Sequence, residues 1–241
     1  SGLTPEVASG HVDLVSVFIG GNDFRDVFTV LATQGPAAAQ AALMAAVPTV
    51  VTNIAIVAGS LTSPDIVAAN PHIDLVLTTI PKLSHLPEVR RALLAVPQIQ
   101  PFVDAVDGAV QIVNQHIFGI AAASDRIGVA DFSGLVDEWF AGPELRVGKV
   151  VINRDELENP TNDPRGLVLA DGIHPGTLGQ GLLANLIVQT ANDKFATHVH
   201  TLSSRDMLTN AGLRKQRNAG CKASHDSIFS QGSTGTRNVA V

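Results

Sequence analysis

The chain has 241 residues, of which 45% are hydrophobic and 16% charged, and its net charge is −6. This length and apolar content predict one globular domain with a large core, and they exclude a chain that is disordered throughout. The single cysteine excludes an internal disulfide framework and a cysteine-rich zinc module. The negative charge and the 4% aromatic content argue against a nucleic-acid-binding protein, which needs a basic face and stacking platforms.

The charge is unevenly distributed along the chain. From Leu213 onward there are five Lys or Arg residues and one acid, Asp226, in a stretch rich in Ser and Gly. We therefore expect a domain over residues 1–212 and a basic, disordered tail over residues 213–241. No leader is recognisable in the first residues. The compartment stays open, since a leader upstream of Ser1 would make the protein extracellular or periplasmic.

One stretch is long and apolar enough to raise the question of a membrane. No charged residue occurs between Asp26 and Asp65, and residues 37–57 could span a bilayer by length. The stretch is, however, built largely from alanine, and it contains a proline and four polar residues (Gln40, Pro48, Thr49, Thr52 and Asn53). This composition favours a buried or amphipathic helix, so we expect no stable membrane span.

Short apolar runs alternate with helical patterns along the chain. In chain order we expect a strand at 12–19, helices at 26–33 and 37–58, a strand at 73–80, helices at 87–94 and 99–123, a strand at 127–132, a helical turn at 137–140, a fourth strand or a flap at 147–153, a loop at 154–170 and a helix at 177–190. This alternation predicts an α/β fold of three layers, α/β/α, with a mostly parallel sheet. Functional loops in such sheets follow the carboxyl ends of the strands.

Two polar motifs lie at such positions. Gly20-Gly21-Asn22-Asp23 follows the first predicted strand, where glycines let a ligand approach and the amide of Asn22 could face a developing negative charge. The alternative is an ordinary turn. Asp171-Gly-Ile-His174-Pro precedes the last predicted helix. There Asp171 could accept a hydrogen bond from one imidazole nitrogen and leave the other as a base, although the same residues also suit a capping loop.

The order of these motifs resembles the GDSL/SGNH family of esterases and lipases, over about residues 1–212. The resemblance implies a flavodoxin-like architecture and a Ser–His–Asp triad in which His174 and Asp171 are two members. It implies that Asn22 and Gly20 form the oxyanion hole, and that no metal or organic cofactor is needed. The implied substrate is a small-molecule, lipid or acetylated-sugar ester, and the oligomeric state is left open.

The chain departs from the family at the nucleophile. The family carries its serine in a Gly-Asp-Ser-Leu-type block after its first strand, and this chain has only eleven residues before its first predicted strand. We therefore expect the N-terminal strand and the nucleophile to be missing from their usual place, which would expose a strand edge. Ser227, in His225-Asp-Ser-Ile, imitates the block weakly, but a basic and polar segment precedes it.

Two alternatives to an active serine esterase remain. One is an inactive fragment or a hydrolase-like domain that binds a partner. The other is a metal-dependent hydrolase that uses Asp171, His174 and His198 or His200, of which the last two have the i, i+2 spacing of ligands on a strand. Trp139 and Phe140 could line an acyl pocket or pack in the core, and His85 is expected to lie at a surface or a helix end.

Overall fold

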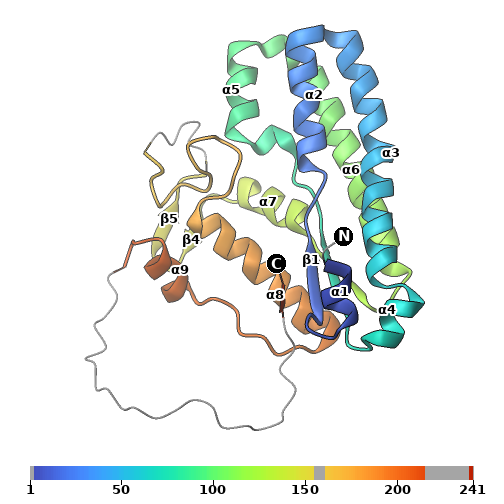
Figure 1. Cartoon of the computed structure of the whole chain (residues 1–241). Coiled ribbons are helices and arrows are strands. Elements are labelled where there is room, and N and C mark those ends of the chain that lie inside the picture. Colours follow the sequence, from blue (N-terminus) through green and yellow to red (C-terminus); the bar gives the residue numbers. More distant parts are fainter. Residues whose placement is uncertain (1–2, 155–160, 215–238, 241) are drawn as a thin grey trace.

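The computed structural model describes residues 3–154, 161–214 and 239–240, and it has an α/β fold (Figure 1). The strands are β1 (Leu14–Val17), β2 (Asp74–Thr78), β3 (Ile127–Ala130), β4 (Leu145–Val147), β5 (Val150–Ile152) and β6 (Val239–Ala240). The α-helices are α1 (Leu3–Ala8), α2 (Gly21–Gln34), α3 (Pro36–Leu61), α4 (Pro64–Ala69), α5 (Pro87–Ala95), α6 (Gln100–Ala122), α7 (Phe132–Ala141), α8 (Thr177–Phe195) and α9 (Ser204–Asn210), and two 3-10 turns are η1 (Leu83–His85) and η2 (Pro97–Ile99).

The main sheet has the strand order β3-β2-β1-β6, and every neighbouring pair in it is parallel. Leu14 of β1 is in register with Asp74 of β2 on one side and with Val239 of β6 on the other. The outer edge of β1, which the sequence predicted to be exposed, is therefore paired over two residues. Because all the strands are parallel, their carboxyl ends meet at one edge of the sheet.

Helices cover both faces of the sheet, as the sequence predicted. Alternate residues of a strand point to opposite faces, so Leu75 and Leu77 of β2 pack with α3 and α6, whereas Val76 packs with α8. A further apolar cluster joins α7, α8 and α9 to the β4–β5 hairpin. The core thus continues from the sheet to the elements that flank its carboxyl edge.

The structure differs from the sequence prediction mainly at short elements. The segment predicted as a fourth strand or a flap at 147–153 contains β5, the second strand of the antiparallel hairpin β4–β5, which lies outside the main sheet and has Gly148 in its turn at a φ of 58°. The strand predicted at 127–132 ends at Ala130, because the Asp131 side chain accepts a hydrogen bond from Gly134 N–H and caps α7. The helices α1, α4 and α9 were not predicted. Most of the predicted tail lies outside the described residues.

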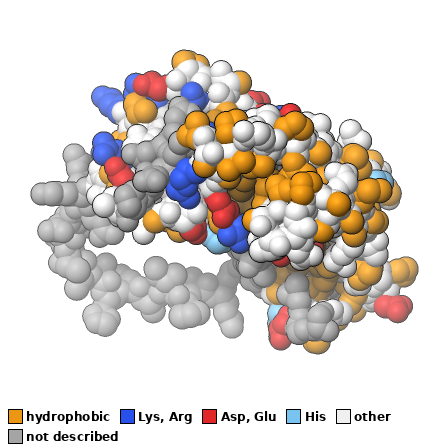
Figure 2. Space-filling model, turned by 90° about the horizontal axis from the view of Figure 1, so that it is seen from above, with side chains coloured by type: hydrophobic (Ala, Val, Ile, Leu, Met, Phe, Trp, Pro, Cys, Tyr) orange, Lys and Arg blue, Asp and Glu red, His pale blue; other side chains and the backbone are white. Residues whose placement is uncertain are grey.

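The long apolar stretch forms α3. By length and composition alone, α3 together with α4 is a candidate membrane span: its most apolar 18 residues have a mean hydropathy of 2.0, and 22% of these residues are buried. One side of α3 packs in the core through Leu43, Val50 and Ile54. Its other side exposes Met44 and Ile56. Seen from above, hydrophobic side chains are concentrated on one side of the molecule (Figure 2).

Candidate active site

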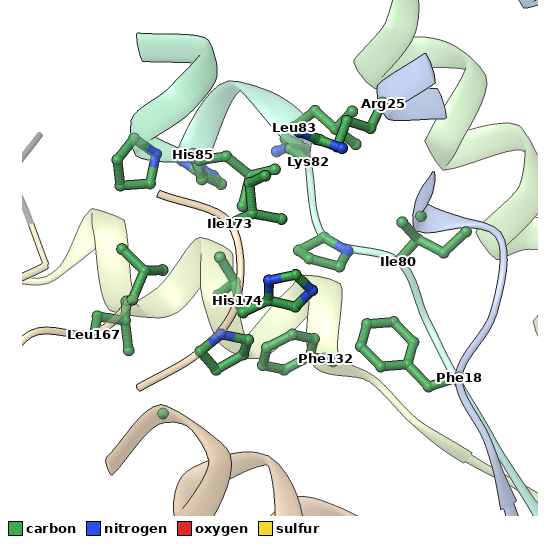
Figure 3. Close-up of a pocket in the computed structure, with 18 of the residues that line it drawn as sticks. Phe18, Arg25, Ile80, Lys82, Leu83, His85, Phe132, Leu167, Ile173 and His174 are labelled. Carbon is green, nitrogen blue, oxygen red and sulfur yellow. The ribbon is translucent and has the colours of Figure 1, made fainter. Parts of the chain in front are cut away.

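A cavity of about 330 Å³ lies at the carboxyl ends of β1, β2 and β3. Residues that follow each of these strands line it, as do the loop before α8 and one face of α7. Figure 3 shows the His174 ring pointing into the cavity, with Phe18 and Phe132 on one side and Ile173, Leu83 and Lys82 on the other. The cavity therefore lies where the parallel sheet predicts a functional site.

The first predicted motif forms the start of α2. Gly20 has a φ of 97°, and a Cβ there would come within 2.5 Å of Val50 Cγ1, so only glycine fits between the strand and α3. The helix begins at Gly21 with no side-chain cap. Gly21 and Asn22 line the cavity, and the exposed Asn22 side chain makes no hydrogen bond to another described residue. The first backbone N–H groups of the helix have no partner within it. This end of the helix carries a partial positive charge.

The second predicted motif forms a tight loop that joins its acid to its histidine. Asp171 Oδ2 accepts a hydrogen bond from His174 Nδ1 at 2.6 Å. Asp171 Oδ1 accepts from the backbone N–H groups of Ile173 and His174 at 2.9 and 3.0 Å. Gly172, with a φ of 76°, lets this loop turn, and its carbonyl accepts from Glu88 N–H. The bond at Nδ1 fixes the imidazole orientation and leaves Nε2 as the acceptor.

The charge state of Asp171 suits this arrangement. Partial burial raises the pKa of the Asp171 carboxyl, but the hydrogen bonds from the His174 side chain and from the two backbone N–H groups outweigh it. The pKa therefore lies below its ordinary value, and Asp171 is ionised at neutral pH. An ionised carboxylate stabilises the imidazolium that forms when Nε2 takes up a proton.

A second histidine–aspartate pair at the cavity was not predicted. His85 Nε2 lies 2.8 Å from Asp137 Oδ1, and Lys82 Nζ lies 2.7 Å from Asp137 Oδ2. The His85 ring stacks on Phe140, with 4.4 Å between ring centroids. The sequence expectation for His85, a surface or helix-end position, is right about the helix end, but the side chain is mostly buried and lines the cavity. Nothing in the sequence links His85 to an aspartate 52 residues away.

Side chains from α6 hold the loop that carries Lys82 and His85. The Asn114 amide accepts from Ile80 N–H and donates to Ile80 C=O, each at 2.8 Å. Asp107 Oδ1 accepts from Leu83 N–H at 2.8 Å. Through these bonds, side chains of α6 satisfy backbone N–H and C=O groups of the loop after β2, which has no neighbouring strand to do so. Ile80 and Leu83 thereby form a fixed wall of the cavity.

An ion pair also lies beside the loop that carries Asp171 and His174. Arg25 of α2 donates two hydrogen bonds to the Glu88 carboxylate, and the bond to Glu88 raises the pKa of Arg25. Because Glu88 N–H also bonds Gly172 C=O, this ion pair connects α2 and α5 to the loop that carries Asp171 and His174. Sequence patterns gave no signal for it, since the two residues lie 63 positions apart.

The structure brings together most of the predicted site residues. Gly20, Asn22 and His174 line one cavity, and Asp171 bonds His174 behind it. Ser227, the weak candidate nucleophile, lies outside the described residues. Among residues 3–154, 161–214 and 239–240, no three His, Cys, Asp or Glu side chains gather closely enough to hold a metal ion. That part of the chain therefore offers no ligand set that joins Asp171 and His174 to His198 or His200.

The comparisons with known proteins find no relative of the chain: no protein-family model, no curated protein and no solved structure matches it.

Proposed function

We propose that the chain is a serine-type carboxylic ester hydrolase of the GDSL/SGNH kind. One observation carries the proposal: a single cavity is lined by His174, which is bonded to Asp171, and by the uncapped start of α2 with Asn22. A base with its orienting acid, beside a group of hydrogen-bond donors, is what acyl transfer through a serine requires.

In the proposed reaction, His174 Nε2 takes the proton of a serine hydroxyl while the serine oxygen bonds the carbonyl carbon of the ester. The tetrahedral intermediate then breaks its bond to the leaving alcohol, which receives the proton from His174. Water attacks the resulting acyl-serine with the same histidine as base, and the acid is released. Asp171 keeps the imidazole oriented throughout these steps.

The start of α2 would stabilise the negative oxygen of the intermediate. The Asn22 amide and the first backbone N–H groups of α2 are donors at the cavity that helix bonding leaves available. In comparable sites one such donor contributes about 3 kcal/mol to the stability of the transition state. The closeness of Gly20 to Val50 fixes the position of this turn.

The nucleophile would come from outside the described lining of the cavity. The residues that the structure assigns to this lining include no Ser, Thr or Cys. Ser227 is the candidate that the sequence offers among the residues not described.

The absence of a nucleophile from the described lining also favours a second candidate function. In this alternative the chain is an inactive, hydrolase-like domain that binds an ester or another apolar ligand in the cavity. The two candidates differ in whether any serine of the chain is activated by His174.

Labelling with a fluorophosphonate probe, followed by peptide mass spectrometry, separates the two functions. We expect one serine of the folded chain to be labelled, and we expect His174→Ala to abolish the labelling and the turnover of a short p-nitrophenyl ester. The matched control is His116→Ala, because His116 is exposed on α6 away from the cavity. Labelling or turnover that persists in His174→Ala would rule out the proposed mechanism. A folded wild-type chain that is not labelled would favour the binding domain.

A further inference from the structure

The aromatic side chains at the cavity form a continuous wall. Phe18, directly after β1, meets Phe132 edge to face with 5.8 Å between ring centroids, and Phe132 meets Trp139 in the same way at 5.9 Å. Phe18 is 43% exposed, whereas Phe132 and Trp139 are 5% and 8% exposed. The wall therefore runs from the open mouth of the cavity to its buried interior.

The lining that α7 contributes to the cavity is apolar. The members of α7 that line it are Phe132, Val136, Trp139 and Phe140, all of them apolar. Among the other lining residues, Lys82 is paired with Asp137 and Arg25 with Glu88, and Arg154 donates to the backbone carbonyls of Trp139 and Gly142. Because each of these cations already has a partner, the cavity has no evident preference for an anionic group. An uncharged hydrocarbon gains most from entering such a surface.

The size of the cavity limits the length of that hydrocarbon. The volume of about 330 Å³ lies at the lower end of the range of about 300–1,000 Å³ that is usual for small-molecule sites. Part of this space must hold the ester group itself, close to His174. The remainder is more than an acetyl group fills, so it accommodates an apolar chain of several carbon atoms.

We infer that the aromatic wall of Phe18, Phe132 and Trp139 binds the acyl group of the substrate, which is an apolar chain of medium length and not acetyl. That the bound group is the acyl part of an ester rests on the proposed function. That the ligand is an apolar chain rests on the cavity alone. Each methylene added between acetyl and octanoyl is expected to raise kcat/KM by about two- to fourfold, because it removes further apolar surface from water.

The chain provides its own reporter for this binding. Trp139 is the only tryptophan of the sequence, so the intrinsic tryptophan fluorescence comes from the aromatic wall alone. Titration with 1-octanol is expected to change this emission saturably, in the wild type and in His174→Ala alike. Titration with 1-butanol over the same concentrations should change it far less. If octanol leaves the emission unchanged, the inference is overturned, even where short esters are hydrolysed.

A chain-length series of p-nitrophenyl esters gives the second measurement. Val136→Phe fills the cavity next to the wall, so the preferred acyl chain should shorten by several carbons. The matched control is Val96→Phe at an exposed position outside the cavity, which should leave the preference unchanged. An acetyl ester hydrolysed as fast as an octanoyl ester overturns the inference. Saturable octanol binding without hydrolysis of any ester overturns the proposed function but supports the apolar class of ligand.

Discussion

His174 and His85 both line the cavity and both bond an aspartate, yet the His174 side chain is 68% exposed and the His85 side chain 23%. Asp171 lies three residues from His174 and is otherwise held by backbone N–H groups of the same loop. Asp137 lies 52 residues from His85 and is shared with Lys82. The His174–Asp171 pair therefore offers an accessible base with one orienting acid, as proton transfer requires. The His85–Asp137 pair instead connects the loop after β2 to α7.

The stack of His85 on Phe140 strengthens this distinction. The two rings are nearly parallel, with 9° between their planes, so one face of the imidazole is covered. A ring held by a stack and by a shared carboxylate has little freedom to approach a substrate. We therefore interpret the His85–Asp137 pair as a clamp between two walls of the cavity, and the His174–Asp171 pair as the chemical unit.

The largest effect is expected from replacing the two aspartates in parallel. Asp171→Asn should lower kcat by about 10²- to 10⁴-fold, because the histidine loses its orientation and the charge that stabilises its protonated form. Asp137→Asn should change kcat much less. Steady-state hydrolysis of one p-nitrophenyl ester measures both. Equal losses in the two variants would contradict the division between a chemical pair and a clamp.

A smaller effect is expected from the turn inside the chemical pair. Gly172 has a φ of 76°, and a Cβ there would come within 2.8 Å of an Arg91 nitrogen and 3.1 Å of Glu88 N. Gly172→Ala should therefore lower both kcat and the unfolding temperature, at a cost of about 1–3 kcal/mol for the strained backbone and the displaced loop. Differential scanning calorimetry and ester turnover measure the two quantities.

Gly212 provides the matched control for this substitution. It has a similar φ of 72°, but a Cβ there would meet nothing within 4 Å. Gly212→Ala carries the backbone strain alone, so it should lower the unfolding temperature less and leave kcat unchanged. If both variants keep full activity, the loop around Gly172 does not position His174.

The clamp should show its effect in stability. Asp137→Asn removes the pair with Lys82 and His85, which are partly exposed, so the free energy of unfolding should fall by about 0.5–1 kcal/mol at neutral pH. Burial raises the pKa of Asp137, but the hydrogen bonds from Lys82 and His85 outweigh it, and the pKa lies below its ordinary value. The stabilisation is then fully present above the unfolded pKa of about 3.9, and it is lost as the pH falls through the lower folded pKa.

Urea unfolding of wild type and Asp137→Asn between pH 6 and pH 3 measures this dependence. The difference in free energy of unfolding should stay constant down to about pH 4 to 5 and shrink below it. A difference that grows as the pH falls below about 4 would contradict a carboxylate that is stabilised in its charged form.

The contrast between features that are local in the sequence and features that join distant elements also explains how much of the structure could be predicted. The strands β1, β2 and β3 were found because they are buried on both faces and read as continuous apolar runs. The helices α2, α3, α5, α6 and α8 were found from their length, periodicity and bounding Gly or Pro residues. The short helices α1, α4 and α9 give too few turns for a period, and their stability depends on tertiary packing and caps.

The candidate site was predictable only where it is local in sequence. Asp171 and His174 stand three residues apart, and Asn22 lies five residues after the end of β1, so spacing could indicate them. The pairs His85–Asp137 and Arg25–Glu88 depend on how distant elements meet at the carboxyl edge of the sheet. Their residue types suggest nothing until the topology brings them together.

The two polar anchors of α6 have a mechanical consequence. Asn114 and Asp107 stand seven residues, or about two turns, apart on α6, and they bond the backbone at Ile80 and at Leu83. The cavity wall is thus attached to a helix whose outer side exposes Ile112 and Phe118 to solvent. Any rigid shift of that helix along its axis would carry both wall residues with it, so the width of the cavity depends on the position of α6.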